Sequence, residues 1–110
     1  VAATGYRHVE TAFFPEGVTP EAAREHLDAA GLGVCAAHTP LPLGDDLPGV
    51  ARLARTLGTD TLVWHGWPED TRHATADGIA SLIRDYRDAA AGAADHGLRL
   101  ALHNHWWEFR

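Results

Sequence analysis

Four residues that can bind a metal ion or carry a proton occur at the same place in a repeated pattern. Each lies five to seven positions after a glycine (5, 31, 58 or 97), at the end of a short apolar run: Glu10, His38, His65 and His103. Neutral imidazole binds Zn, Mn, Fe or Co, and carboxylates complete such coordination shells. The pattern therefore predicts one polar site assembled from four separate segments of the chain.

The last of these segments carries two more candidate residues. His103 and His105 are two positions apart, so on an extended chain they point to the same side. Glu108 follows, between Trp107 and Phe109. A carboxylate beside bulky aromatic rings tends to have a raised pKa, which suits a general acid or base. We therefore predict a catalytic role for Glu108, with a solvated or salt-bridged carboxylate as the alternative reading, which also applies to Glu10.

Tryptophans flank two of the predicted rim histidines. Trp67 and Trp106 are candidates for stacking on the apolar face of a sugar ring, although core packing is the alternative for both. Trp64 is expected to be a core residue, and Cys35 a small buried apolar residue. The remaining histidines lie away from the predicted rim and are interpreted as surface or packing residues: His8, His26, His73 and His96.

The elements that must position these residues alternate along the chain. Strands are predicted near 6–14, 32–37, 59–64 and 98–102, and helices near 20–30, 46–57 and 76–96. Thr19 followed by Pro20 is a good helix start, and glycines suit left-handed helix ends. The long third helix is expected to bury one apolar face, made of Ile79, Leu82, Ile83, Tyr86, Ala90, Ala93 and Ala94.

Strands separated by amphipathic helices must pair in parallel, which brings their carboxyl ends to one rim. Four strands and three helices fit half of a (β/α)8 barrel, and they also fit part of an open doubly wound sheet. Since no strand is followed by Gly-x-Gly-x-x-Gly, the barrel is preferred. We predict a single α/β domain over residues 1–110, a partial TIM barrel.

Composition narrows the classes of function. The net charge of −6 and the lack of a Lys/Arg cluster disfavour nucleic-acid binding. No apolar run approaches the roughly 18 residues of a membrane span, and no leader peptide is visible. One cysteine gives no sign of an oxidising compartment, so a cytoplasmic protein is expected. The chain begins as if inside a helix, which suggests a fragment.

The final segment also resembles a known signature. Residues 100–109, Leu-Ala-Leu-His-Asn-His-Trp-Trp-Glu-Phe, are similar to the His-Asn-His-x-x-Glu-Phe motif of the sugar phosphate isomerase/epimerase family, which belongs to the xylose isomerase-like TIM barrels. Residues 5–10, 31–38 and 57–63 resemble the same family in the same order. The resemblance spans nearly the whole chain and implies strands two to five of the barrel.

The resemblance implies a function for the complete barrel. Relatives use one divalent metal (Mn, Zn, Mg or Co) to move a proton next to a carbonyl of a ketose or related polyol. His103 stands where many relatives have a glutamate ligand, so His103 or Glu108 is the expected ligand here, and residues outside this chain would complete the shell. Glu108 is the expected proton carrier, and the expected substrate contacts are Glu10, His38, His65, His105, Trp67 and Trp106.

Two alternative functions and two further expectations accompany this reading. An AP endonuclease-like phosphodiesterase of the same superfamily carries strand-end histidines, and a barrel that binds sugar without turnover is also possible. The 110-residue chain alone is expected to be inactive, because neither the metal shell nor the barrel is complete. Its two unpaired strand edges make a homo-oligomer or aggregation an expectation as well.

Overall fold

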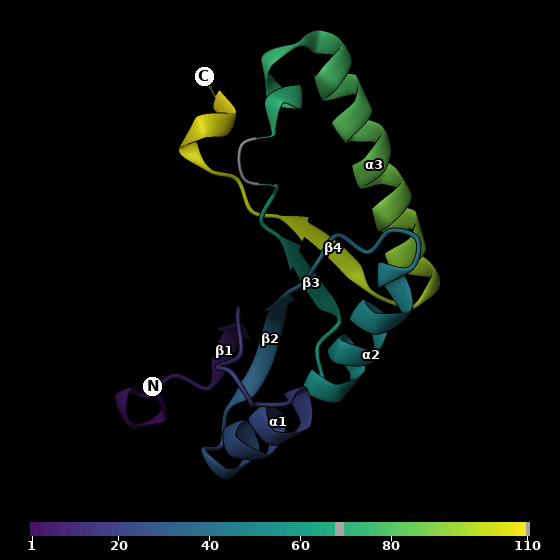
Figure 1. The fold of residues 1–110 in the computed structure, drawn as a ribbon. Helices are drawn as coiled ribbons and strands as arrows, with labels where there is room; N and C mark the ends of the chain where they lie inside the picture. The colour runs from purple at the N-terminus through teal and green to yellow at the C-terminus, as the bar shows by residue number, and fades with distance from the viewer. Residues whose placement is uncertain (68–69, 110) are drawn as a thin grey trace.

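The computed structural model describes residues 1–67 and 70–109, except for the side chains at positions 107 and 109. Four strands alternate with three helices, and short 3-10 turns complete the chain (Figure 1). The strands are β1 (His8–Thr11), β2 (Gly33–His38), β3 (Thr61–Trp64) and β4 (Arg99–Leu102). The helices are α1 (Pro20–Ala29), α2 (Asp46–Leu57) and α3 (Ala76–Asp95), and the 3-10 turns are η1 (Ala2–Thr4), η2 (Thr71–Ala74) and η3 (Trp106–Phe109).

The four strands form one parallel sheet in the order of the sequence, β1-β2-β3-β4. Val9 pairs with Val34, and Leu62 pairs with Leu100. All four arrowheads in Figure 1 point toward the side of the molecule where the C-terminal turn η3 lies. The predicted α/β architecture and the common rim of strand ends are therefore confirmed.

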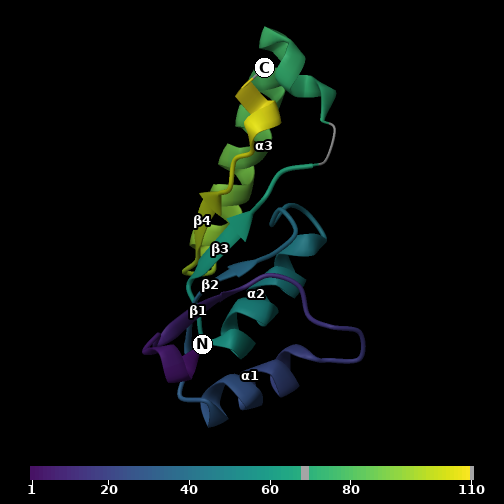
Figure 2. The same ribbon diagram turned by 90° about the vertical axis from the view of Figure 1, so that its left-hand side faces the viewer.

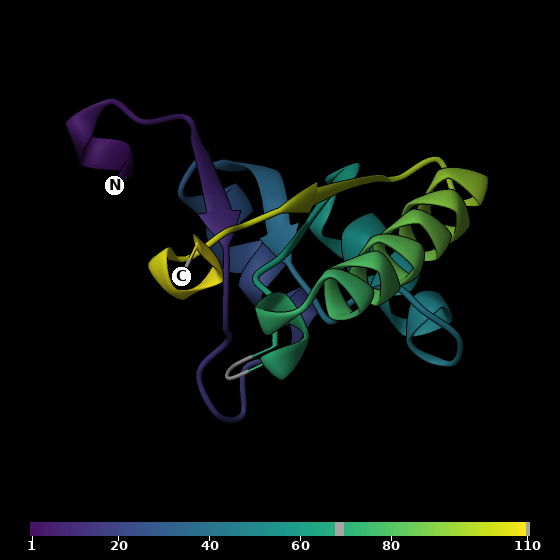
Figure 3. The ribbon, with the colours of Figure 1, turned by 90° about the horizontal axis from the view of Figure 1, so that it is seen from above.

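The helices cover one face of this sheet, as the turned views show (Figures 2 and 3). Leu62 of β3 is fully buried in a cluster that joins α2, α3 and the sheet, together with Val50, Ala51, Ala54, Ala93 and Leu98. A second cluster, around Leu57 and Val34, joins α1 and α2 to β1 and β2. The buried apolar surface between helices and sheet is what holds the strand ends in a fixed relation.

Local signals place the helix ends where the sequence predicts them. The Thr19 side chain accepts a hydrogen bond from the backbone N–H of Ala22 at 3.2 Å, which caps α1. Gly58 takes a left-handed φ of 72° directly after α2, a conformation that costs a residue with a Cβ atom about 1 kcal/mol or more.

The structure corrects the predicted burial of Cys35 and part of the predicted buried face of α3. Cys35 is exposed, because its neighbour Val34 faces the helices and Cys35 therefore lies on the opposite, uncovered face of the sheet. Ile79 and Ile83 are 45% and 46% exposed rather than buried. Leu82 and Ala93 of the predicted face are buried, as is Ala89, while Ala90 and Ala94 are exposed.

The first strand is also shorter than predicted. The predicted segment reaches residue 14, but β1 ends at Thr11, and Phe13 and Phe14 lie in the loop that follows. Pro15 cannot donate to a strand ladder, so pairing stops before it. This change places two aromatic side chains beside the rim of the sheet rather than within it.

The arrangement is open rather than closed. Its radius of gyration is 15.5 Å, whereas a compact domain of this length has about 13 Å. Strands β1 and β4 are the two edges of the sheet. Glu10 of β1, Cys35 of β2 and Ala101 of β4 are exposed. No helix in the described part of the chain is long and apolar enough to cross a membrane.

Candidate functional site

The predicted rim residues from all four strands meet in one array. Nε2 of His38, at the end of β2, lies 2.6 Å from Oε1 of Glu10 in β1. The His38 ring stacks on the His65 ring with 6.0 Å between centroids, and it meets the His103 ring edge-on at 5.8 Å. Parallel pairing explains the convergence, because the residues at or next to each strand's carboxyl end lie at the same edge of the sheet.

The array continues into the C-terminal turn. The rings of His103 and His105 are 4.7 Å apart, so the prediction that these two side chains share a side is confirmed. Glu108 accepts a hydrogen bond from the backbone N–H of His105 at 2.9 Å, and its other carboxylate oxygen lies 3.4 Å from Nδ1 of the same residue. Glu108 is 14% exposed and lies against Gly66, where an added Cβ would come within 3.1 Å of the carboxylate.

The predicted raised pKa of Glu108 depends on its two aromatic neighbours in the sequence. The side chains of Trp107 and Phe109, which the sequence places on either side of it, lie outside the described residues. The Glu108 carboxylate lies near Gly66, just after β3, and accepts a hydrogen bond from the backbone N–H of His105.

His65 lies in a partly buried setting among other imidazole rings. Burial lowers the pKa of His65 below its ordinary value of 6.5, and the nearby imidazoles of His38, His105 and His103 lower it further. Phe13 meets the ring edge-on at 5.9 Å, and Trp64 lies 5.1 Å away. His65 is therefore neutral at pH 7 and can both donate and accept a hydrogen bond.

The two candidate tryptophans lie in different surroundings. Trp67 packs edge-on against Trp64 with 4.8 Å between centroids and stacks on Tyr86 at 6.4 Å. Trp64 in turn contacts His65. Trp106 is 63% exposed beside the end of the array. Whether either ring contacts a substrate stays a prediction.

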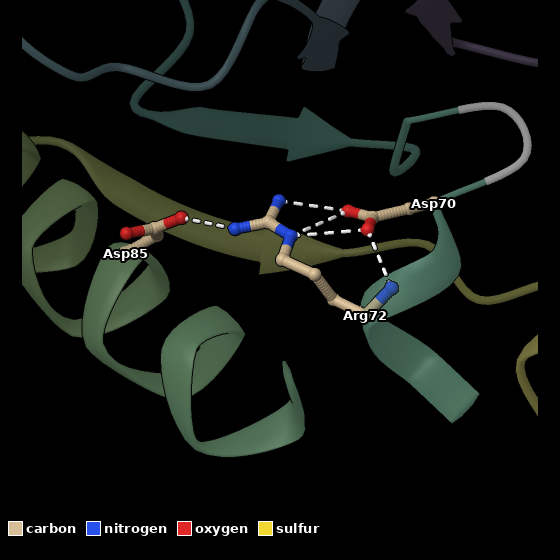
Figure 4. A network of polar contacts seen from close by, with 3 residues as sticks. All are labelled: Asp70, Arg72 and Asp85. Carbon is tan, nitrogen blue, oxygen red and sulfur yellow. Dashed lines mark hydrogen bonds and ion pairs between the residues drawn. The ribbon is translucent and has the colours of Figure 1, made fainter. Parts of the chain in front are cut away.

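An arginine bridge fixes the loop that carries Trp67. The Arg72 guanidinium donates to both carboxylate oxygens of Asp70 and to Asp85 of α3, with a shortest distance of 2.7 Å to each (Figure 4). Its Cζ lies 4.7 Å from the centre of the Trp67 ring. The bridge ties the turn η2 to helix α3 and places a cation over the indole, a favourable arrangement.

Replacing Asp70 with asparagine is expected to weaken this bridge and alter the acid response. The hydrogen bonds from Arg72 hold the pKa of Asp70 below its ordinary value of 3.8. Their stabilisation is therefore complete above that value and is lost as pH falls through the lowered pKa of the folded state. Asp70→Asn should lower the free energy of unfolding by about 1 kcal/mol at pH 7 and flatten its decline below pH 4, as measured by urea unfolding.

The matched control is Asp88→Asn, an exposed carboxylate on the same helix as Asp85. It should leave both the stability and its acid decline nearly unchanged. Equal behaviour of the two variants would show that the bridge contributes nothing to stability.

Comparisons with known proteins bear on the fold of this site. No family model and no curated protein matches the chain. A sugar phosphate isomerase/epimerase from Parabacteroides distasonis superposes with a TM-score of 0.68 at 19% identity, covering 99% of this chain and 44% of that chain. An AP endonuclease, family 2, from Brucella melitensis superposes with a TM-score of 0.64 at 19% identity, covering 92% and 45%.

The chain has the fold of part of a TIM barrel. It spans less than half the length of each of the two solved structures. At this identity the likeness establishes the architecture, while chemistry must be argued from the site itself.

The side chains at the rim of this partial TIM barrel suit a divalent metal by their chemistry. Imidazole nitrogens and carboxylate oxygens are ligands of Zn, Mn and Co, and the array offers both kinds at neighbouring positions. Among the described residues, no three His, Cys, Asp or Glu side chains converge closely enough to hold an ion by themselves. Metal binding by His103 or Glu108 therefore stays a prediction.

Sequence reasoning missed several residues that shape the site. Phe13 is read from the sequence as part of a strand, yet it packs on His65. Thr39 is 3% exposed, directly after His38, and its hydroxyl has no hydrogen-bond partner in the described part of the chain. A buried threonine next to a rim histidine carries no sequence signal, whereas the aromatic pair before Pro15 could have been read as a loop.

Proposed function

We propose that the intact protein is a sugar or sugar phosphate isomerase or epimerase that moves a proton next to a carbonyl of a ketose or polyol with the help of a divalent metal. One observation carries the proposal: a continuous array of four imidazoles from three strand ends, with a carboxylate at each extremity, Glu10 and Glu108. Proton transfer at a carbon atom needs a carboxylate or imidazole within reach and groups that hold the hydroxyls on either side.

Each residue has a role in this proposal. Glu108 accepts and returns the proton, since its carboxylate is partly buried and held by the backbone of His105. His38 and His65 hold substrate hydroxyls, and Glu10 fixes the orientation of His38. His105, Trp67 and Trp106 complete the substrate contacts. A divalent metal held by His103 or Glu108 would supply polarisation of the carbonyl oxygen.

The proposal is tested by exchange of substrate hydrogen with solvent. We expect the intact protein, incubated with Mn²⁺ and a panel of ketoses in heavy water, to incorporate deuterium at the carbon next to the carbonyl, detected by NMR. Metal chelation should abolish this exchange. Binding of a ketose without exchange would favour a barrel that binds sugar without turnover, and the proposed reaction would then be wrong.

Phosphodiester cleavage is the second candidate function. The superposition on an AP endonuclease and the adjacent imidazoles of His38 and His65 favour it. The net charge of −6 disfavours binding of a phosphate backbone, and Arg72, the cation beside Trp67, is already paired with two carboxylates. Nicking of a duplex that contains an abasic site, without ketose exchange, would select this reading.

We propose that the intact protein acts in carbohydrate metabolism in the cytoplasm. We also propose that the 110-residue chain by itself self-associates, since its edge strands β1 and β4 then present free backbone groups. A mass that depends on protein concentration in analytical ultracentrifugation would support this proposal.

A further inference from the structure

Gly66, directly after His65, differs from the other left-handed glycines in what surrounds it. Seven glycines among the described residues have a left-handed φ, and that of Gly66 is 79°. At the other six, an added Cβ atom would meet nothing within 4 Å, so the backbone conformation alone explains the glycine. At Gly66 the added Cβ would lie 3.1 Å from Oε1 of Glu108, closer than ordinary van der Waals contact. A glycine is therefore needed at position 66 for space as well as for conformation.

The Glu108 carboxylate is oriented by contacts on its other side. One carboxylate oxygen, Oε2, accepts a hydrogen bond from the backbone N–H of His105 at 2.9 Å, and Oε1 lies 3.4 Å from Nδ1 of the same residue. The Glu108 side chain is only 14% exposed. A methyl group at position 66 would therefore push the carboxylate against the contacts that now orient it.

The backbone at Gly66 is itself fixed by the next residue. Trp67 packs against two other aromatic rings, and the Arg72 guanidinium lies over its indole ring. Moving the backbone at position 66 would disturb all of these contacts, whereas moving the carboxylate would disturb only its contacts with His105. We therefore expect Glu108, and not the loop, to shift when a side chain is added at position 66.

We propose that Gly66 is a positioning residue for proton transfer by Glu108: the lack of a side chain at position 66 lets the carboxylate lie against the backbone just after His65. The proposal rests on the proposed function, in which Glu108 carries the proton. It implies that any residue with a Cβ atom at position 66 slows the reaction while ketose binding is kept.

The first test compares two glycines that have the same φ. Gly66→Ala and Gly17→Ala both force alanine to a φ of 79°, but only Gly66→Ala places a Cβ atom against a carboxylate. In the intact protein, with Mn²⁺ and the ketose that exchanges fastest, Gly66→Ala should lower the maximal deuterium-exchange rate by about 10-fold or more. The half-saturating ketose concentration should change by less than about threefold.

The Gly17→Ala variant should keep both values of the parent protein. Equal exchange rates in the two variants, or a change in the half-saturating concentration alone, would overturn the proposal. Gly66→Asn repeats the test with less backbone strain, because asparagine tolerates a left-handed φ better than alanine and still carries a Cβ atom. A parent exchange rate in Gly66→Asn would also overturn the proposal.

A double-mutant cycle shows whether residue 66 acts through Glu108. In a Glu108→Gln background, Gly66→Ala should lower the residual exchange rate by less than about twofold, because the displaced group no longer takes up a proton. A further drop of about 10-fold in that background would mean that the substitution harms the reaction by another route, and the proposal would be wrong.

Unfolding by urea supplies a readout that does not depend on the reaction. Gly66→Ala should lower the urea midpoint of the intact protein by about 0.5 M more than Gly17→Ala does. In a Glu108→Ala background this excess should vanish, because no carboxylate is left for the Cβ atom to meet. An excess that persists without the carboxylate would contradict the inference.

The two kinds of readout separate this inference from the proposed function. If the parent protein exchanges no ketose hydrogen but the stability cycle shows the coupling, the isomerase function is wrong and the seating of Glu108 on Gly66 is supported. If the parent protein exchanges hydrogen and the coupling is missing, the function is supported and the role of Gly66 is wrong.

Discussion

Replacing Glu108 with glutamine should lower the rate of deuterium exchange into a ketose substrate by about 10²- to 10⁴-fold. Glutamine has nearly the same shape and can still accept the hydrogen bond that Glu108 now accepts from the backbone of His105 at 2.9 Å. It cannot take up a proton, so the loss isolates proton transfer from the folding of the turn. The rate is measured by NMR at saturating substrate, with the ligand affinity measured in parallel.

The control for this variant is Glu16→Gln, an exposed glutamate in the loop before α1, which should exchange at the parent rate. A Glu108→Gln protein within about threefold of the parent rate would remove Glu108 from the mechanism. Metal affinity then separates its two predicted roles. If metal binding falls together with the exchange rate, Glu108 is a ligand, and if only the rate falls, Glu108 is the proton carrier.

Glu10, the other carboxylate of the array, is expected to position His38 and not to carry the proton. Glu10 is paired with His38 across the strand pair β1 and β2. Glu10→Gln therefore changes the orientation of the His38 imidazole and removes no proton carrier. We expect it to raise the substrate dissociation constant more than it lowers the exchange rate. This difference between binding and rate distinguishes a positioning residue from a catalytic one.

The strand ends that form the site could be predicted because local rules determine them. Glycines 31, 58 and 97 each adopt a left-handed φ after a helix, and a glycine after an amphipathic stretch is a reliable helix end. Parallel pairing then follows from connection length, so the meeting of His38, His65 and His103 could be inferred before any distance was known.

The surroundings of those residues depend on contacts between distant segments, and the sequence alone does not determine such contacts. Cys35 is a small apolar residue of the kind found in protein cores. It is exposed, because its face of the sheet carries no helix among the described residues, whereas the opposite face does. Ile79 and Ile83 fit an apolar helix stripe, yet α3 is rotated so that Leu82, Ala89 and Ala93 are buried. The bridge from Arg72 to Asp85 joins residues 13 positions apart through a turn whose path has no sequence signature.

The largest expected effect on stability comes from Leu62→Ala in the middle of β3. Leu62 is fully buried, and its side chain contacts a cluster from α2, α3 and the start of β4. Removing most of an enclosed leucine side chain typically costs 2–5 kcal/mol, since the transfer free energy is lost and a cavity remains. Small domains are stable by only about 5–15 kcal/mol, so urea unfolding followed by tryptophan fluorescence should show a much lower midpoint.

The effect should reach the site as well, because β3 continues directly into Trp64 and His65. Leu102→Ala is the matched control: the same side chain is removed from β4, where it is 52% exposed, and about 1 kcal/mol or less should be lost. Equal losses in the two variants would mean that the cluster around Leu62 does not hold the helices to the sheet. A large loss in Leu62→Ala alone would show that the packing of α2 and α3 keeps the strand ends, and with them the histidine array, in register.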